Sequence, residues 1–128
     1  MKPTFRGGLN IAVKIPKAKY QATLQFYGET LGLELEERPI SHPEITRTHR
    51  VVFGPNILWL DCVPTKTHSE TWLELRTEEM GLAEAYLHEN GVRFCDEIED
   101  IPKGMHWLTD PAGTVFILCE NDSEQENK

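Results

Sequence analysis

Alternating apolar and polar positions near the start of the chain predict a half-buried β-strand. Between residues 9 and 15 every second residue is apolar, and the residues between them are polar or small. Apolar side chains then recur at helical spacing, which predicts a helix over residues 18–30 with Gly32 just beyond its end. Three further strands are expected, over residues 33–38, 46–53 and 57–63.

The same order of elements repeats after a polar linker at residues 64–70. A strand is expected over residues 71–76, followed by a helix over residues 78–90 that Gly91 closes as Gly32 closes the first. The remaining strands are expected over residues 92–95, 105–109 and 115–120. A repeat with a period of about sixty residues indicates the duplication of one supersecondary unit.

The chain is therefore predicted to be a single α+β domain spanning residues 1–128. It consists of two βαβββ modules, residues 8–63 and 71–120, which form a cupped, mostly antiparallel eight-stranded sheet with the helices on its outer face. One module alone would leave a face of its sheet uncovered, whereas two modules share one sheet. The polar residues 121–128 are expected to form a frayed acidic tail.

The charge balance restricts the kinds of partner. The net charge is −8, and an acidic surface repels nucleic acid and anionic lipid, so neither is an expected partner. No apolar run is long enough for a membrane span, and no secretory signal is visible, so we expect a cytoplasmic protein. The three cysteines are too widely spaced to form a paired metal-binding or redox motif.

Two motifs carry a family resemblance. Residues 26–35 read FYGETLGLEL, and residues 110–113 read DPAG directly before the last expected strand. Together with the two-module pattern, they resemble the vicinal-oxygen-chelate superfamily, which includes glyoxalases, bleomycin-resistance proteins and dioxygenases. This resemblance implies the two-module fold and a homodimer. The family's enzymes usually hold a divalent metal through His, Gln or Glu on the first and last strands of each module.

The resemblance places residues of other types at most of the family's ligand positions. The first-strand His falls on Asn10, and the final Glu falls on Ile117. The equivalent position in the first module falls near Trp59, and the second module's first-strand position falls on Glu70 or Trp72. Tryptophan and isoleucine do not ligate hard divalent ions. We therefore predict that the family's metal site is lost, and we expect neither a metal nor another cofactor.

We expect Ile11, Val13 and Ile15 of the first strand to face the first helix. The side chains on the opposite face are expected to line the cup, and their mixed character suits an organic ligand. The predicted ligand-binding residues are Asn10, Trp59, Asp61, Trp72, Glu74 and Ile117. The tryptophans offer stacking surfaces, and the two carboxylates could pair with a cation. This favours metal-independent binding of a small cationic or aromatic molecule. An equally weighted interpretation is that both tryptophans fill the cup as core.

Two other functions remain open on the sequence. The first is a superfamily enzyme of lyase, isomerase or dioxygenase type with a displaced metal site. Its candidate catalytic residues are His106 and Glu74, with Glu70 as a further base or ligand; a strand histidine is more often structural. The second is an interaction module whose cup is filled. A homodimer is expected in each case.

Overall fold

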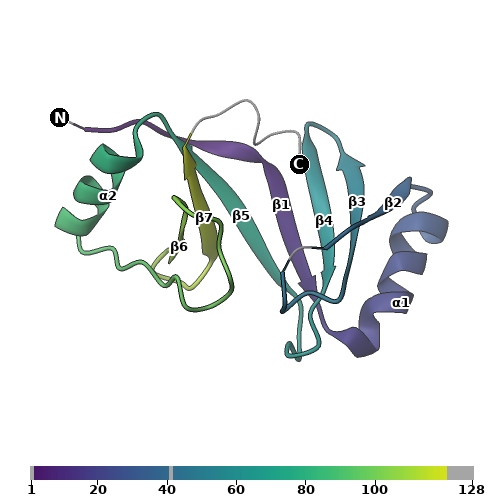
Figure 1. Ribbon diagram of the computed structural model, residues 1–128. Coiled ribbons are helices and arrows are strands. Elements are labelled where there is room, and N and C mark those ends of the chain that lie inside the picture. The colour runs from purple at the N-terminus through teal and green to yellow at the C-terminus, as the bar shows by residue number, and fades with distance from the viewer. Residues whose placement is uncertain (1, 41, 121–128) are drawn as a thin grey trace. The chain divides into compact units, whose positions relative to one another are not determined.

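The computed structural model describes residues 2–40 and 42–120, in which seven strands, two α-helices and one π-helical turn form (Figure 1). In chain order the elements are β1 (Phe5–Ile15), α1 (Lys17–Gln25), η1 (Phe26–Thr30), β2 (Leu35–Arg38), β3 (Arg47–Phe53), β4 (Asn56–Cys62), β5 (Glu70–Thr77), α2 (Met80–Glu89), β6 (His106–Thr109) and β7 (Val115–Glu120). The α+β class is confirmed. The acidic tail predicted at residues 121–128 lies outside the described residues.

Two compact units divide the described chain. Residues 10–71 form the first unit, and the residues up to Leu9 together with those from Trp72 onward form the second unit. Strand β1 therefore contributes to both units. Its first residue, Phe5, packs in the core of the second unit, with its ring centroid 6.2 Å from that of Tyr86.

Each unit pairs its strands in the same way. In the first unit the order is β2-β3-β4-β1, and in the second it is β5-β7-β6. Neighbours β2/β3, β3/β4 and β6/β7 are antiparallel, whereas β1/β4 and β5/β7 are parallel. The two antiparallel steps after the first helix leave β4 running in the same direction as β1. The strand pairing is therefore mixed, and the prediction of a mostly antiparallel sheet is confirmed only in part.

The strand predicted over residues 92–95 does not form, which leaves seven described strands instead of eight. This segment makes a single β-bridge, between Phe94 and Leu108. Directly after it, the carboxylate of Asp96 accepts the backbone N–H of Trp107 at 2.8 Å. A side chain thus satisfies an amide that a longer strand would have paired, and the local β-pattern does not extend into a ladder.

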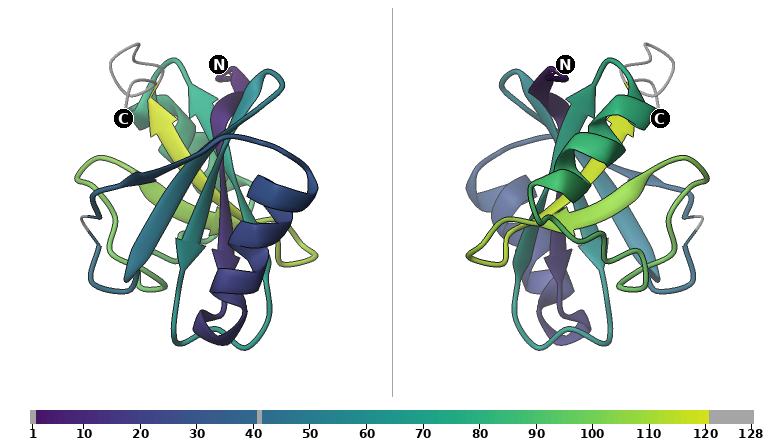
Figure 2. Two further views of the ribbon diagram at one scale, coloured as in Figure 1. Left: turned by 90° about the vertical axis from the view of Figure 1, so that its right-hand side faces the viewer. Right: turned by 90° about the vertical axis from the view of Figure 1, so that its left-hand side faces the viewer.

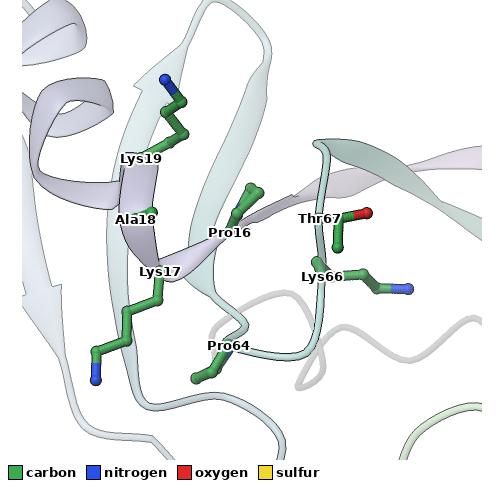
Figure 3. A pocket seen from close by; sticks show the side chains of 7 residues that line it. All are labelled: Pro16, Lys17, Ala18, Lys19, Pro64, Lys66 and Thr67. Atoms are coloured by element: carbon green, nitrogen blue, oxygen red, sulfur yellow. The ribbon is translucent and has the colours of Figure 1, made fainter.

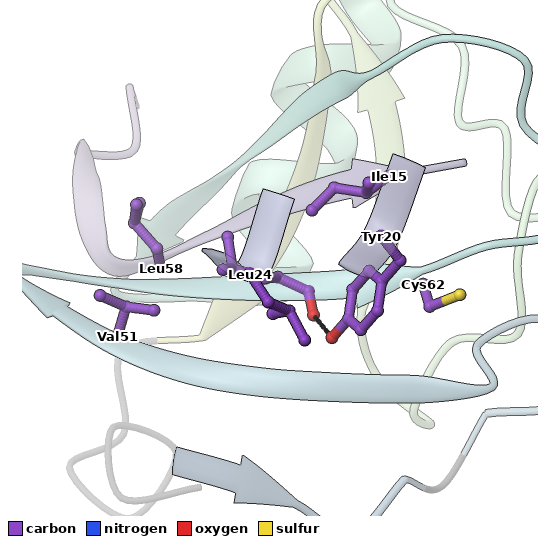
Figure 4. Packing of buried hydrophobic residues seen from close by; sticks show 7 residues of the cluster. Ile15, Tyr20, Leu24, Val51, Leu58 and Cys62 are labelled. Atoms are coloured by element: carbon purple, nitrogen blue, oxygen red, sulfur yellow. Dashed lines mark hydrogen bonds between the residues drawn. The ribbon is translucent and has the colours of Figure 1, made fainter. Parts of the chain in front are cut away.

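Helix α1 packs on one face of the first unit's strands. Tyr20 and Leu24 lie one helical turn apart and are buried against alternate residues of β1 and β4 (Figure 4). The Tyr20 hydroxyl donates a 2.7 Å hydrogen bond to the carbonyl oxygen of Leu60. The buried cluster consists of Ile15, Tyr20, Leu24, Val51, Leu58, Leu60 and Cys62, with Ile11 and Val13 packed against it. The predicted helix-facing side of β1 is confirmed.

The first helix ends earlier than predicted because its last turn widens. Helix α1 stops at Gln25, and the next turn, η1, closes through a hydrogen bond from the Leu31 amide to the Phe26 carbonyl. A Cβ atom at Gly28 would lie 2.5 Å from Leu35 Cδ1, so glycine allows this turn to approach β2. Gly32 then takes a φ of +75°, which ends the turn.

The second unit repeats this packing with α2. Ala83 of α2 is buried with Leu108 of β6 and Leu118 of β7, and Leu75 of β5 packs against them. Figure 2 shows α1 lying along the strands of the first unit in its left view and α2 along β6 and β7 in its right view. Neither described helix is long and apolar enough to cross a membrane.

The predicted DPAG turn joins β6 to β7. Asp110 accepts hydrogen bonds from the backbone N–H groups of Thr114 and Ala112, both at 2.9 Å, and Gly113 has a φ of +102°. The hydrogen bond from Thr114 is the main reason that the pKa of Asp110 lies below its ordinary value. This turn directs the chain into β7, whose side chains enter both faces of the second unit.

Candidate functional site

We call the strand face opposite the helix the inner face of each unit. In the first unit it carries two of the predicted ligand-binding residues in direct contact. The indole Nε1 of Trp59 donates a 2.8 Å hydrogen bond to Oδ1 of Asn10. Strand alternation explains this contact, because Asn10 and Trp59 lie on the side of β1 and β4 that faces away from α1. Both side chains remain partly exposed.

Asp61 also lies on the inner face of the first unit, but it is engaged by protein groups. Lys14 Nζ lies 3.0 Å from one carboxylate oxygen, and the Thr48 hydroxyl donates to the other at 2.6 Å. Lys14 and Asp61 are 2% and 5% exposed. A buried carboxylate is retained in a protein only with such partners. Lys14 therefore already provides Asp61 with the positive charge that the sequence prediction assigned to a cationic ligand.

Strand β3 adds a residue that sequence reasoning missed. Arg50 lies directly opposite Trp59 in the antiparallel register of β3 and β4, two residues beyond Thr48. Side chains two apart on a strand share a face, so Arg50 is on the inner face with Trp59. It is half-buried. The alternation of side chains along β3 could have identified Arg50, because it places His49 and Val51 on the opposite face.

Glu74 lies on the inner face of the second unit, in a buried ion pair. Arg76 Nη2 is 3.2 Å from Glu74 Oε2, and Arg76 Nη1 is 3.3 Å from the carbonyl oxygen of Glu120. The backbone of Gly8 packs against the Glu74 side chain so closely that a Cβ there would overlap its carboxylate. Ile117 is the neighbour of Glu74 in the parallel register of β5 and β7.

Trp72 belongs to the core of the second unit. Its ring meets that of Trp107 edge to face, with centroids 5.0 Å apart. The Trp107 indole N–H donates to the Glu99 carbonyl oxygen at 2.9 Å. The two tryptophans are only 4% and 6% exposed. Within this unit the structure therefore favours the interpretation of Trp72 as packing.

His106 lies on the outer face of the second unit, beside α2. Its Nδ1 is 2.8 Å from Asp96 and its Nε2 is 2.7 Å from Glu84, while its ring stacks on Phe94. Carboxylates only accept hydrogen bonds, so this arrangement fits the imidazolium form, in which both ring nitrogens donate. Partial burial alone would lower the pKa of His106, but its hydrogen bonds to the carboxylates of Asp96 and Glu84 outweigh this effect and raise the pKa above 6.5. These contacts describe an ion cluster that joins α2 to β6.

The residues at the family's ligand positions do not fit a divalent metal. Of the four positions, those at Trp59 and Ile117 have side chains that do not ligate metal ions, and the Asn10 oxygen already accepts a hydrogen bond from the Trp59 indole N–H. Glu70 is paired with Lys66 at 3.2 Å and lies 3.6 Å from His68. Among residues 2–40 and 42–120, no group of three or more His, Cys, Asp and Glu side chains is arranged to hold a metal ion.

A separate hollow of about 670 Å³ lies at the start of α1 in the first unit. It is lined by Pro16, Lys17, Ala18, Lys19, Pro64, Lys66 and Thr67. Figure 3 shows the three lysine side chains extending in different directions. Their ammonium groups therefore do not converge on one point, and we assign no ligand to this hollow.

Solved structures with a similar fold include several enzymes. Methylmalonyl-CoA epimerase from Mycobacterium tuberculosis matches with a TM-score of 0.62 and 14% identity, over 95% of this chain and 92% of that one. The Mn(II)-bound glyoxalase from Novosphingobium aromaticivorans matches with a TM-score of 0.60 and 12% identity, over 93% and 40%. A xylose isomerase-like TIM barrel/4-hydroxyphenylpyruvate dioxygenase fusion protein matches with a TM-score of 0.66 and 14% identity, over 95% and 20%. At these identities the likeness shows the fold alone.

Comparisons at the level of sequence give no match. No family model matches the chain, and no curated protein matches it.

Proposed function

Because this chain has the vicinal-oxygen-chelate fold, we propose that it is a metal-independent binder of a small organic molecule. The hydrogen bond between Trp59 and Asn10 is the observation that carries this proposal. This hydrogen bond joins Asn10 and Trp59, which stand at two positions where the family resemblance implies metal ligands, and it orients the Trp59 indole. The fold's ligand-binding position is thereby converted from a coordination site into a stacking surface.

The physical role of Trp59 follows from its surroundings. Its N–H is satisfied by Asn10 and its ring is partly exposed, so the ring face is available to a planar ligand at little cost in side-chain ordering. A flat ligand with aromatic character suits this partly exposed ring face.

The expected preference for cations depends on the net charge of −8. Asp61 and Glu74 were its predicted receptors, but Lys14 and Arg76 already engage them. Cationic aromatics therefore belong in a test panel on the strength of the overall charge. The homodimer and the cytoplasmic location predicted from the sequence are part of the same proposal.

A titration of tryptophan fluorescence tests the role of Trp59. Planar aromatic probes of positive, zero and negative charge are titrated into the wild-type chain, Trp59→Phe and Trp59→Leu. We expect at least one probe to quench wild-type emission, and the quenching to be lost in Trp59→Leu. Phe53→Leu, at an exposed apolar residue on the opposite face of β3, is the matched control and should bind as the wild type does. Equal quenching in wild type and Trp59→Leu would contradict the proposal.

An enzyme with a displaced metal site is the second candidate function. It is supported by the buried Glu74 beside Arg76 and by structural neighbours that are an epimerase, a glyoxalase and a dioxygenase fusion protein. Reconstitution with nickel, zinc, manganese and iron, followed by metal analysis, distinguishes it from the binder. Retention of about one equivalent of metal, the occupancy of an ordinary site, would favour the enzyme.

An interaction module with a filled inner face is the third candidate. The burial of Trp72 and Trp107 supports it for the second unit. The partial exposure of Trp59 and Asn10 argues against it for the first. Failure of every probe to bind would favour this reading over the other two.

A further inference from the structure

The charges of the side chains on the inner face of the first unit do not sum to zero. Strand alternation places three cations there, Lys14, Arg38 and Arg50, and two carboxylates, Glu36 and Asp61. This face carries a net charge of +1 within a chain whose net charge is −8. The local balance therefore has the opposite sign to the overall one.

Both carboxylates are held by the other two cations. Asp61 is 3.0 Å from Lys14, and Glu36 is 3.6 Å from Arg38. Glu36 lies opposite Arg50 in the register of β2 and β3, but it is largely exposed and its ion pair is with Arg38. Within residues 2–40 and 42–120, the guanidinium of Arg50 makes no hydrogen bond or ion pair.

Arg50 is thus a half-buried cation with no carboxylate of the described residues within ion-pair distance, and it lies directly beside the stacking surface. It faces Trp59 across β3 and β4, and Trp59 is in turn bonded to Asn10 of β1. A guanidinium presents a planar fork of donors that matches a carboxylate in a two-point contact. A partly desolvated arginine gains more from such a contact than a fully solvated one does.

We propose that the ligand of the inner face is a planar aromatic anion, whose ring stacks on Trp59 and whose carboxylate binds Arg50. This inference rests on the proposed binding function and names the class of its ligand. A monoanion matches the net charge of +1, whereas a phosphate dianion would leave one charge uncompensated. A cationic ligand stacked on Trp59 would be repelled by the neighbouring Arg50.

The test compares three probes that differ only in charge: naphthoate, neutral naphthamide and naphthylmethylammonium. Each is titrated calorimetrically into the full-length wild-type chain, Arg50→Gln, Arg50→Lys and Trp59→Leu. Arg47→Gln is the matched control, because Arg47 is on the same strand, is exposed and pairs with Glu37 beside α1. Circular dichroism and unfolding midpoints verify that each variant is folded.

We expect the wild type to bind naphthoate about tenfold more tightly than naphthamide, the factor for one charge-assisted contact. Arg50→Gln should abolish this difference while leaving naphthamide binding unchanged, and Arg50→Lys should restore part of it. Arg47→Gln should behave as the wild type.

Two results would overturn the inference in distinguishable ways. If naphthamide or the ammonium probe binds through Trp59 as tightly as naphthoate, the ligand is not anionic, although the binding function stands. If no probe binds, the proposed function fails together with this inference. Equal loss of naphthoate binding in Arg50→Gln and Arg47→Gln would also contradict a specific role for Arg50.

Discussion

The inner faces of the two units use the same kinds of residue differently. Each has a buried ion pair, Lys14 with Asp61 in the first unit and Glu74 with Arg76 in the second. Their tryptophans differ. Trp59 is partly exposed and is held by a single hydrogen bond, whereas Trp72 is buried and packs edge to face on another tryptophan.

The neighbour of each tryptophan explains this difference. In the second unit, the neighbouring Trp107 covers Trp72 and completes a core. In the first unit, the residue opposite Trp59 is Arg50, whose charge disfavours close packing and whose fork suits an anionic ligand. A tryptophan on the inner face is therefore buried in one unit and partly exposed in the other, according to the residue that lies beside it.

Truncation of the tryptophans should give the largest difference in stability between variants of the two units. Trp72→Ala should lower the free energy of unfolding by about 4 kcal/mol, because it leaves a large cavity in a buried aromatic pair. Trp59→Ala should lower it by less than half as much, since its ring is already partly hydrated. Urea denaturation of both variants measures the difference. Equal losses would show that Trp59 is also core.

Removal of one partner of the first unit's ion pair should have the next largest effect. Lys14→Met leaves the buried Asp61 carboxylate without its cation and should cost about 3 kcal/mol of stability. A double variant, Lys14→Met with Asp61→Leu, should recover most of the loss because no unpaired charge remains. Urea denaturation checks both. A double variant as unstable as the single one would mean that the ion pair itself stabilises the fold.

Two adjacent glycines provide a matched test of the second unit. Gly8→Ala would push a methyl group into the buried Glu74 carboxylate and should cost about 2 kcal/mol, as overpacking does. Gly7→Ala meets no atom within 4 Å and should leave stability nearly unchanged. Thermal unfolding compares them. Equal stability of the two variants would show that the Glu74 side chain moves freely.

The ion cluster at His106 should stabilise the second unit more at acidic than at alkaline pH, whereas burial lowers the pKa of His49 in the first unit. The pKa of His106 is raised in the folded chain, so its stabilising effect is fully present below the unfolded value of 6.5 and is lost as pH rises through the folded pKa. Glu84→Gln should therefore lower stability more at acidic than at alkaline pH. Denaturation midpoints across this range test it. An NMR titration in which the ring of His106 titrates at or below 6.5 would contradict the assignment.

The sequence predicted the faces of the strands well because alternation depends only on local geometry. It identified Ile11, Val13 and Ile15 as the residues of β1 packed beside α1, and it placed Asn10 and Trp59 together on the opposite side. The two helices and the DPAG turn also formed where expected, with boundaries that shifted by a few residues.

The sequence was less informative where the surroundings of a residue depend on a distant partner. Residues 92–95 have a β-pattern, but Asp96 captures the Trp107 amide and ends the pairing. His106 was predicted as a candidate catalytic residue, and its side chain lies on the same face of β6 as Leu108, beside α2. Asp61 and Glu74 were expected to receive a ligand, and nothing local revealed that Lys14 and Arg76 already hold them.

The most direct test of metal-independent binding at Trp59 is a calorimetric titration of naphthoate into chelator-treated protein and into protein loaded with manganese. We predict that the two affinities are equal and that both disappear in Trp59→Leu. Binding that requires the metal, or that survives in Trp59→Leu, would contradict our proposal that a stacking surface at Trp59 replaces the metal site of the family that this chain resembles.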